Sequence, residues 1–230
     1  MVPSPLVALG FLGALQGSAN IVERQTKACA TGVHIIVCRA STEQPGTGVI
    51  GAIATNIQRQ IPGSDIEAVK YPAELNPYNP SQEAGVKAMT KLVQDYAANC
   101  PDSKMVLMGY SQGAHVTADV MCGTSERGFT ATQPQSAEVA SKVAAILLMG
   151  DPSHVTGQPY NQGTSQNNGL FPRTKPAGCS AVANKMISIC NTGDPFCDGG
   201  RNLQVHLSYV QTNGDAATRF IMSKVKAGAA

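Results

Sequence analysis

The fold is decided by the segment Lys104-Met105-Val106-Leu107-Met108-Gly109-Tyr110-Ser111-Gln112-Gly113-Ala114-His115. Residues 105–110 are nearly all apolar, which is typical of a strand buried on both faces of a sheet. Residues 114–118 favour the start of a helix. The intervening G-x-S-x-G pattern therefore has the strand–turn–helix setting in which a serine projects at the carboxyl edge of a sheet. We predict Ser111 as a nucleophile and the N–H of Gln112 as an oxyanion donor at the helix start.

Similar apolar runs occur on both sides of this segment, and amphipathic segments separate them. The further predicted strands are residues 33–38, 66–71, 143–149 and 185–190, and the predicted helices include 49–61, a helix capped by Ser81, and 216–225. Continuously apolar strands that alternate with helices indicate a parallel sheet covered on both faces. We predict a three-layer α/β/α sandwich with a five-stranded parallel sheet and right-handed crossovers.

Composition limits the classes of function. The chain has 230 residues, of which 43% are hydrophobic and 14% charged, and 17 basic against 15 acidic residues give a net charge of +2. This composition supports a packed core, and the balanced charge disfavours a nucleic-acid or anionic-membrane partner. After the N-terminal segment, no apolar run is long enough to span a bilayer. We expect a globular domain that acts as a monomer.

The N-terminal segment and the cysteines indicate an exported protein. Residues 1–19 carry no charged side chain, contain an apolar core at 6–15, and end in the small residues Gly17, Ser18 and Ala19. This pattern is typical of a signal peptide. We predict a signal peptide over 1–19, an N-terminal extension over 20–28, and one catalytic domain over 29–230. Seven cysteines favour an oxidising compartment, and their spacing shows no zinc motif. We therefore predict a secreted protein with no metal and no cofactor.

The expected chain order of such a nucleophile elbow is serine, then acid, then histidine. His206 follows the fifth predicted strand, and Asp194 lies between Cys190 and Cys197, which are close enough to form a small disulfide ring. Such a ring would restrict the loop and hold the carboxylate against the imidazole. We predict Ser111, Asp194 and His206 as nucleophile, acid and base.

The other histidines leave one alternative open. His34 lies inside the first predicted strand and His115 inside the elbow helix, so packing is the better interpretation of both. Asp151 and His154 follow the fourth predicted strand. The alternative site takes Asp151 as the acid, with His154 or His206 as the base.

Four motifs together resemble the cutinase-like serine esterases, the fungal cutinases and acetylxylan esterases of carbohydrate esterase family five. They are residues 109–113, residues 190–197, His206, and Arg39-Ala40-Ser41-Thr42-Glu43, in that family's order. The resemblance covers the chain from about Cys29 onward. It implies a small α/β hydrolase without a lid, the same three catalytic residues, and an oxyanion hole formed by Ser41 and Gln112.

The resemblance also implies three disulfides. The implied pairs are Cys29–Cys100, Cys122–Cys179 and Cys190–Cys197. Cys38 then remains unpaired at the end of a hydrophobic strand, which favours an inert, buried thiol.

Within the family, residues 121–123, 149–152 and 176–179 are more similar to those of the acetylxylan esterases than to those of the fungal cutinases. The 72–80 loop offers Asn76, Tyr78 and Asn79, residue types that bind sugars, whereas Phe196 replaces the tyrosine usual in acetylxylan esterases. We expect a secreted esterase that forms an acyl-enzyme and deacetylates acetylated xylan. Hydrolysis of cutin or another polyester is the alternative, and a secreted binding domain without turnover is a third possibility.

Overall fold

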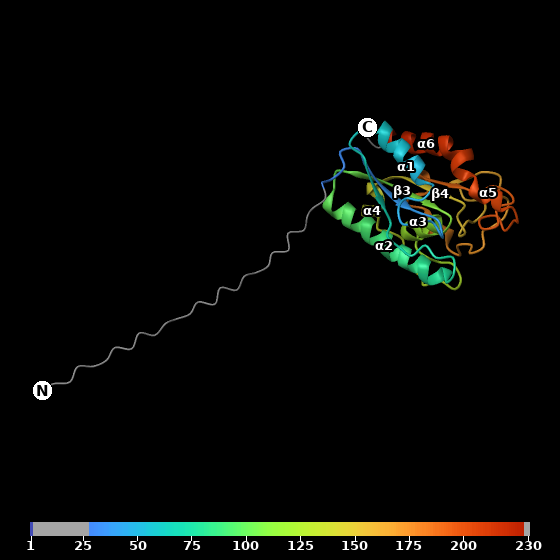
Figure 1. Cartoon of the computed structure of the whole chain (residues 1–230), viewed down its shortest axis with the longest axis horizontal. Helices are drawn as coiled ribbons and strands as arrows, with labels where there is room; N and C mark the ends of the chain where they lie inside the picture. The colour runs from blue at the N-terminus through green and yellow to red at the C-terminus, as the bar shows by residue number, and fades with distance from the viewer. Residues whose placement is uncertain (2–27, 228–230) are drawn as a thin grey trace.

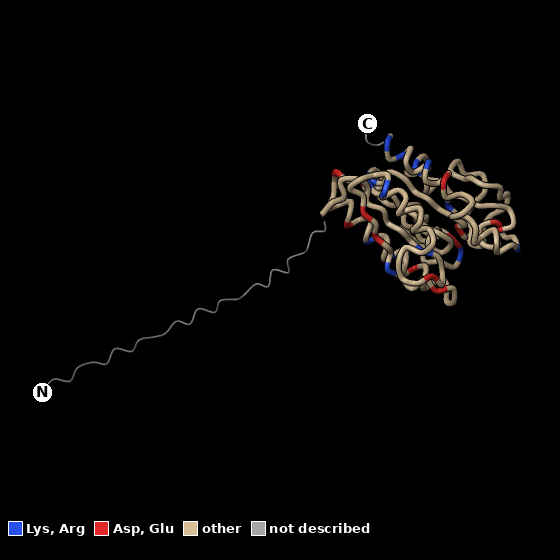
Figure 2. The backbone as a smooth tube through the Cα atoms, turned by 45° about the horizontal axis from the view of Figure 1, so that its top comes forward, with Lys and Arg blue, Asp and Glu red and all other residues tan. Residues whose placement is uncertain are grey.

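A computed structural model describes Met1 and residues 28–227 (Figure 1). Apart from Met1 and Ala28, the predicted signal peptide and N-terminal extension lie outside the described residues. Within the described residues, basic and acidic positions are interspersed along the chain (Figure 2). No helix among these residues combines the length and the apolar character needed to cross a membrane.

A parallel sheet forms the centre of the fold. Its strands, in the order β2-β1-β3-β4-β6-β5, are β1 (Val33–Cys38), β2 (Asp65–Ala68), β3 (Lys104–Tyr110), β4 (Val143–Met149), β5 (Asn161–Gln162) and β6 (Met186–Ile189). All five predicted strands are present. The prediction of a five-stranded sheet was nevertheless wrong by one strand, because β5 adds a sixth at the edge. β5 has only two polar residues, so no hydrophobic period could reveal it, and its pairing with β6 alone defines it.

Helices cover both faces of the sheet, as predicted. They are α1 (Gly51–Gln60), α2 (Tyr78–Asn99), α3 (Gln112–Cys122), α4 (Ala137–Lys142), α5 (Leu203–Leu207) and α6 (Tyr209–Ala227), with short 3-10 turns at Pro176–Cys179 and Ala183–Lys185. α1 and α6 lie on one face and α2 and α3 on the other (Figure 1).

The side chains of β3 alternate between two cores. Met105 and Leu107 belong to the core under α2 and α3, whereas Val106, Met108 and Tyr110 belong to the core under α1 and α6. Because successive strand residues point to opposite faces, a continuously apolar strand must be covered on both sides. This burial confirms the three-layer α/β/α prediction.

Two predicted helix starts were wrong. α2 begins at Tyr78, and Ser81 lies within its first turns instead of capping it. The Ser81 hydroxyl accepts a hydrogen bond from the Glu74 N–H at 2.8 Å and donates one to Gln112 Oε1 at 3.0 Å. α6 begins at Tyr209, well before the predicted position 216. In α6 the helix continues through Gly214, a residue of low helix propensity that packs near Ile53 of α1.

A buried cluster of charges attaches the 151–180 loop to α3. Arg173 lies 2.8 Å from Asp119 Oδ1 and 3.1 Å from Glu126 Oε1, and it donates to the Gly123 carbonyl at 2.7 Å. Burial raises the pKa of Asp119 to about 6, although the positive charges of His115 and Arg173 act to lower it. The guanidinium therefore offsets part of the cost of burying two carboxylates.

Replacing Arg173 with methionine removes this charge and keeps an apolar side chain in its place. We expect Arg173→Met to lower the free energy of unfolding by about 3–5 kcal/mol, because Asp119 and Glu126 would remain buried without their cation. Urea denaturation measures the change.

Lys91→Met is the matched control, because the Lys91–Asp95 pair is exposed on α2. Its effect should stay below about 1 kcal/mol. A loss at Arg173 no larger than the loss at Lys91 would contradict a stabilising role for the buried cluster.

Candidate active site

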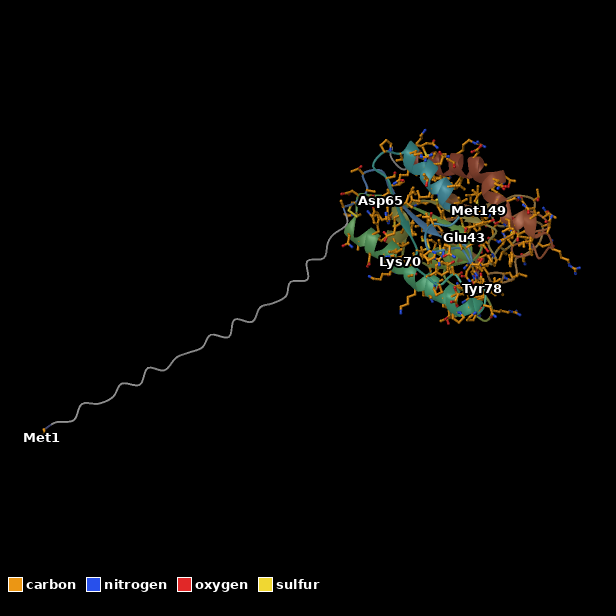
Figure 3. The ribbon with its side chains drawn as sticks, in the orientation of Figure 1. Met1, Glu43, Asp65, Lys70, Tyr78 and Met149 are labelled. Atoms are coloured by element: carbon orange, nitrogen blue, oxygen red, sulfur yellow. A yellow bond between two sulfur atoms is a disulfide. The ribbon has the colours of Figure 1, made fainter. Side chains whose placement is uncertain are left out.

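Ser111 occupies the sharp turn between β3 and α3. Its backbone has φ 54° and ψ −121°, a conformation that residues with a side chain rarely adopt. Its N–H donates to the carbonyl of Met149 at 2.8 Å, at the carboxyl end of β4 (Figure 3). Its own carbonyl accepts from Ala114 at 2.9 Å and from His115 at 3.1 Å. These hydrogen bonds hold a strained backbone of the kind that concentrates at functional sites.

The two glycines of the pentapeptide permit a close approach of the main chain. A Cβ atom on Gly109 would lie 2.2 Å from the Gly113 carbonyl oxygen, and one on Gly113 would lie 2.1 Å from that of Cys38. Because neither distance is compatible with a side chain, the pattern G-x-S-x-G is required by the backbone itself.

The structure brings Ser111, His206 and Asp194 together. His206 Nε2 lies 3.0 Å from Ser111 Oγ, and His206 Nδ1 lies 2.8 Å from Asp194 Oδ2. All three side chains are buried, and Ser111, at 9% exposure, is the most accessible of them. These contacts form the hydrogen-bonded series that a serine nucleophile, a general base and an orienting acid require.

Asp194 is held by its own loop. Its second oxygen, Oδ1, accepts from the N–H groups of Phe196 at 2.7 Å and Cys197 at 3.1 Å, and the Cys190–Cys197 disulfide closes the loop. Burial opposes ionisation, but the contact with His206 and the two backbone N–H groups outweigh it and lower the pKa of this carboxyl. Asp194 is therefore suited to remain an anion beside an imidazolium.

His206 is enclosed by residues whose contact with the imidazole the sequence interpretation did not predict. The ring of Phe196 lies 4.4 Å from the imidazole between centroids, and the ring of Tyr110 lies 5.6 Å away. A Cβ on Gly150 would lie 2.8 Å from the imidazole Cε1. Tyr110 is the last residue of β3 and Gly150 directly follows β4. Their position at the carboxyl ends of parallel strands could have marked them as neighbours of the site.

The two predicted oxyanion donors lie on segments fixed by hydrogen bonds. Ser41 Oγ is buried and has no hydrogen-bond partner among the described residues, so its hydroxyl is free to donate. Gln112 is the first residue of α3, where an N–H has no acceptor within the helix. Its side chain is anchored by a bond from Nε2 to the Glu74 carbonyl at 2.9 Å.

The loop that carries Ser41 is rigidly held. Arg39 donates to the Tyr71 carbonyl at 2.8 Å, and the Glu43 carboxylate accepts from the N–H groups of Ala40 and Val49, both at 2.7 Å (Figure 3 labels Glu43). The loop therefore presents Ser41 without needing to reorganise.

The alternative acid and base make other contacts. The Asp151 carboxylate accepts from the N–H and the hydroxyl of Ser153, both at 2.8 Å, and His154 Nδ1 has no hydrogen-bond partner among the described residues. His206, which the alternative also considered as base, pairs with Asp194 instead.

The remaining histidines make structural contacts. His34 lies 2.7 Å from Asp65 and stacks on Tyr96. His115 lies beside Asp119 and Glu126, and these three residues place potential ligand atoms within 4.8 Å of one another. Because Arg173 already binds both carboxylates and supplies the balancing charge, the donor set fits an ion-pair cluster better than a metal site.

The disulfides match the pairing that the resemblance implied. Cys29–Cys100, Cys122–Cys179 and Cys190–Cys197 are all present. Cys38 is unpaired and buried, and burial raises its pKa to about 12. The thiol is therefore held in its unreactive, protonated form.

Known proteins are similar to this chain in sequence and in fold. The sequence model of the cutinase family matches residues 29–225. Cutinase 11 of Verticillium dahliae is 34% identical, over 94% of this chain and 75% of that protein. An acetylxylan esterase of Hypocrea jecorina is 33% identical, over 97% and 76%. A solved acetyl xylan esterase structure superposes with a TM-score of 0.81 at 32% identity, covering 86% of this chain and all of that one.

Asp194→Asn tests the role of the carboxylate. We expect kcat for p-nitrophenyl acetate to fall by roughly 10³–10⁴-fold with little change in KM, because an amide favours the wrong imidazole tautomer. Steady-state kinetics measures this. If kcat of the variant stayed within about tenfold of the parent value, Asp194 would not be the orienting acid.

The lowered pKa of Asp194 also predicts how stability depends on pH. Since the folded-state pKa lies below the unfolded one, the ionised carboxylate stabilises the fold above the ordinary aspartate range, and this contribution is lost as pH falls through the folded-state pKa. The difference in unfolding free energy between parent and Asp194→Asn should shrink as pH falls below the ordinary aspartate range, about 4. Denaturant titrations across this range check it, and a difference that grows in acid would contradict it.

Proposed function

Because this chain belongs to the cutinase family, we propose that it hydrolyses esters through an acyl-enzyme on Ser111 and that acetylated xylan is its polymer substrate. Its relatives include acetylxylan esterases and cutinases, so the chain is a carboxylic ester hydrolase. The observation that supports the proposed mechanism is the continuous hydrogen-bonded series from Ser111 through His206 to Asp194, at 3.0 and 2.8 Å.

The proposed reaction has two halves. Ser111 Oγ attacks the ester carbonyl while His206 Nε2 accepts its proton, and Asp194 stabilises the imidazolium. Ser41 and the Gln112 N–H donate to the developing oxyanion. His206 then protonates the leaving alcohol, and water repeats the sequence to release the acid. These steps use no metal or cofactor.

Similarity supports the choice of acetylated xylan. Three of the solved structures most similar to this one are acetylxylan esterases, with TM-scores from 0.78 to 0.81. The predicted sugar contacts of the 72–80 loop receive less support. The Tyr78 hydroxyl already contacts His115 at 3.1 Å, and the Asn79 amide donates to the Gly128 carbonyl at 2.8 Å. Asn76 remains exposed.

A specific observation favours the second candidate, a cutin or polyester substrate. Apart from Met1, the exposed large apolar residues of the described chain are Val49, Leu75, Leu170, Leu203 and Leu207. Three of these residues, Leu170, Leu203 and Leu207, are connected to the site. Leu203 and Leu207 flank His206, and the Leu170 N–H donates to the carbonyl of Phe196 at 2.9 Å. Exposed apolar side chains next to a catalytic histidine suit an apolar ester.

Location and assembly extend the proposal. We infer a secreted monomer with residues 1–19 as signal peptide and a single catalytic domain over 29–230, acting without nucleic-acid or membrane partners. The three disulfides support an oxidising compartment. A binding domain without turnover is disfavoured, because recognition alone does not require the three side chains to be assembled in hydrogen-bond contact.

Ser111→Ala tests catalysis directly. We expect turnover of p-nitrophenyl acetate to fall by at least about 10³-fold, while the thermal midpoint changes little because only one hydroxyl is removed. Equal rates in variant and parent would refute the assignment of the nucleophile.

The parent protein then distinguishes the two substrates. Preference for acetate over longer acyl esters, with acetate release from acetylated xylan, supports the first candidate. Faster turnover of long-chain esters and release of fatty acids from cutin, both reduced when Leu203 and Leu207 are replaced by serine, would establish the second instead.

A further inference from the structure

We propose that Tyr110 is a positioning residue for the general base: its hydroxyl holds the main chain of His206, so that the strand that ends in the nucleophile also fixes the imidazole. This inference rests on the proposed catalytic role of His206 and goes beyond it. Tyr110 is the last residue of β3 and directly precedes Ser111. Its hydroxyl donates a hydrogen bond to the carbonyl oxygen of His206, 96 positions away in the chain.

The element that carries His206 needs such support. α5 spans only Leu203–Leu207, and a helix of this length has no stability of its own in water. The carbonyl groups of its last turn also lack N–H donors within the helix. The Tyr110 hydroxyl satisfies the carbonyl of the one residue in α5 that contacts Ser111. A buried carbonyl left without a donor would be costly, so the bond fixes where this short helix sits.

The position of the tyrosine makes the contact specific. Tyr110 is 3% exposed, and its ring lies nearly parallel to the imidazole, with 5.6 Å between centroids and 19° between planes. Phe196 contacts the imidazole as well, at 4.4 Å. The imidazole is thus held by rings, by Asp194 at Nδ1, and through its own backbone by Tyr110.

Ring packing and the hydroxyl make separable contributions. If Tyr110 served only to fill the core beside Tyr209, phenylalanine would serve as well. If the hydroxyl positions His206, its removal lets α5 shift, and the 3.0 Å contact between imidazole and serine is populated less often. Catalysis depends steeply on such distances, whereas binding of a small ester does not.

Tyr110→Phe is therefore the test. We expect kcat for p-nitrophenyl acetate to fall about tenfold, measured well below the thermal midpoint, with KM changed by less than about twofold. The low-field NMR signal of the proton shared by His206 and Asp194 should broaden or disappear. A purely structural role would lower the thermal midpoint and leave both kcat and this signal unchanged, and that result would overturn the proposal.

Tyr96→Phe is the matched control. The Tyr96 hydroxyl also makes hydrogen bonds across the fold, accepting from the Ala30 N–H at 3.1 Å and pairing with Ser103 at 2.7 Å, but it lies near the amino ends of the strands. Its removal should lower stability without changing kcat. An equal loss of kcat in both variants would attribute the effect to general destabilisation and overturn the proposal.

The wild-type protein supplies a measurement that requires no variant to fold. The Tyr110 hydroxyl proton should appear by NMR as a slowly exchanging signal, because it is buried and bonded to a carbonyl. Rapid exchange with water would contradict the proposal. The failure of the proposed function is distinguishable: the wild-type protein would then show no esterase activity, whereas failure of the positioning role leaves it active and Tyr110→Phe equally so.

Discussion

The close approach of three main-chain segments around Ser111 is the constraint on which the rest of the site depends. The end of β1 lies so close to the first turn of α3 that Gly113 has no room for a side chain. Gly113 in turn leaves no room for a side chain on Gly109. Between these two glycines, Ser111 has a positive φ of 54°. The close approach of β1 and α3 places the first N–H of α3 beside the loop that follows β1, where Ser41 lies. The proposed nucleophile and the proposed oxyanion donors therefore lie around one packing contact.

Backbone strain is concentrated at the same edge. Among the described residues, the non-glycine residues with positive φ are Thr42, Ala73 and Ser111. Thr42 donates to the carbonyl of Ala73 at 2.7 Å, so two strained loops support each other. Such conformations cost of order 1–3 kcal/mol each and persist only where surrounding contacts hold them. Here those contacts include Arg39, Glu43 and Tyr71, and the result is a rigid rim around the serine.

Two buried acid–histidine groups in this fold show how environment separates chemistry from structure. Asp194 is bonded to His206, whose other nitrogen faces a serine hydroxyl. Asp119 lies beside His115 as well, but Arg173 binds the carboxylate and the cluster is closed to solvent. The same residue types thus orient the proposed general base in one place and join a loop to a helix in the other. Only the first group places an imidazole nitrogen within hydrogen-bond distance of the Ser111 hydroxyl.

The layered fold could be predicted from the alternation of apolar strands and amphipathic helices, together with the pentapeptide around Ser111. Both are local features, because the spacing of buried residues and the glycines needed at close approaches can be recognised in short segments of sequence. The short polar strand β5 and the early starts of α2 and α6 were not predictable, since pairing and packing with distant segments create them. Chain order favoured His206 among the four histidines and Asp194 as its acid. Their hydrogen-bond contact, however, exists only in three dimensions. The contact of Tyr110 with a carbonyl 96 residues away had no local signal at all, because it arises only once α5 is folded onto the end of the sheet.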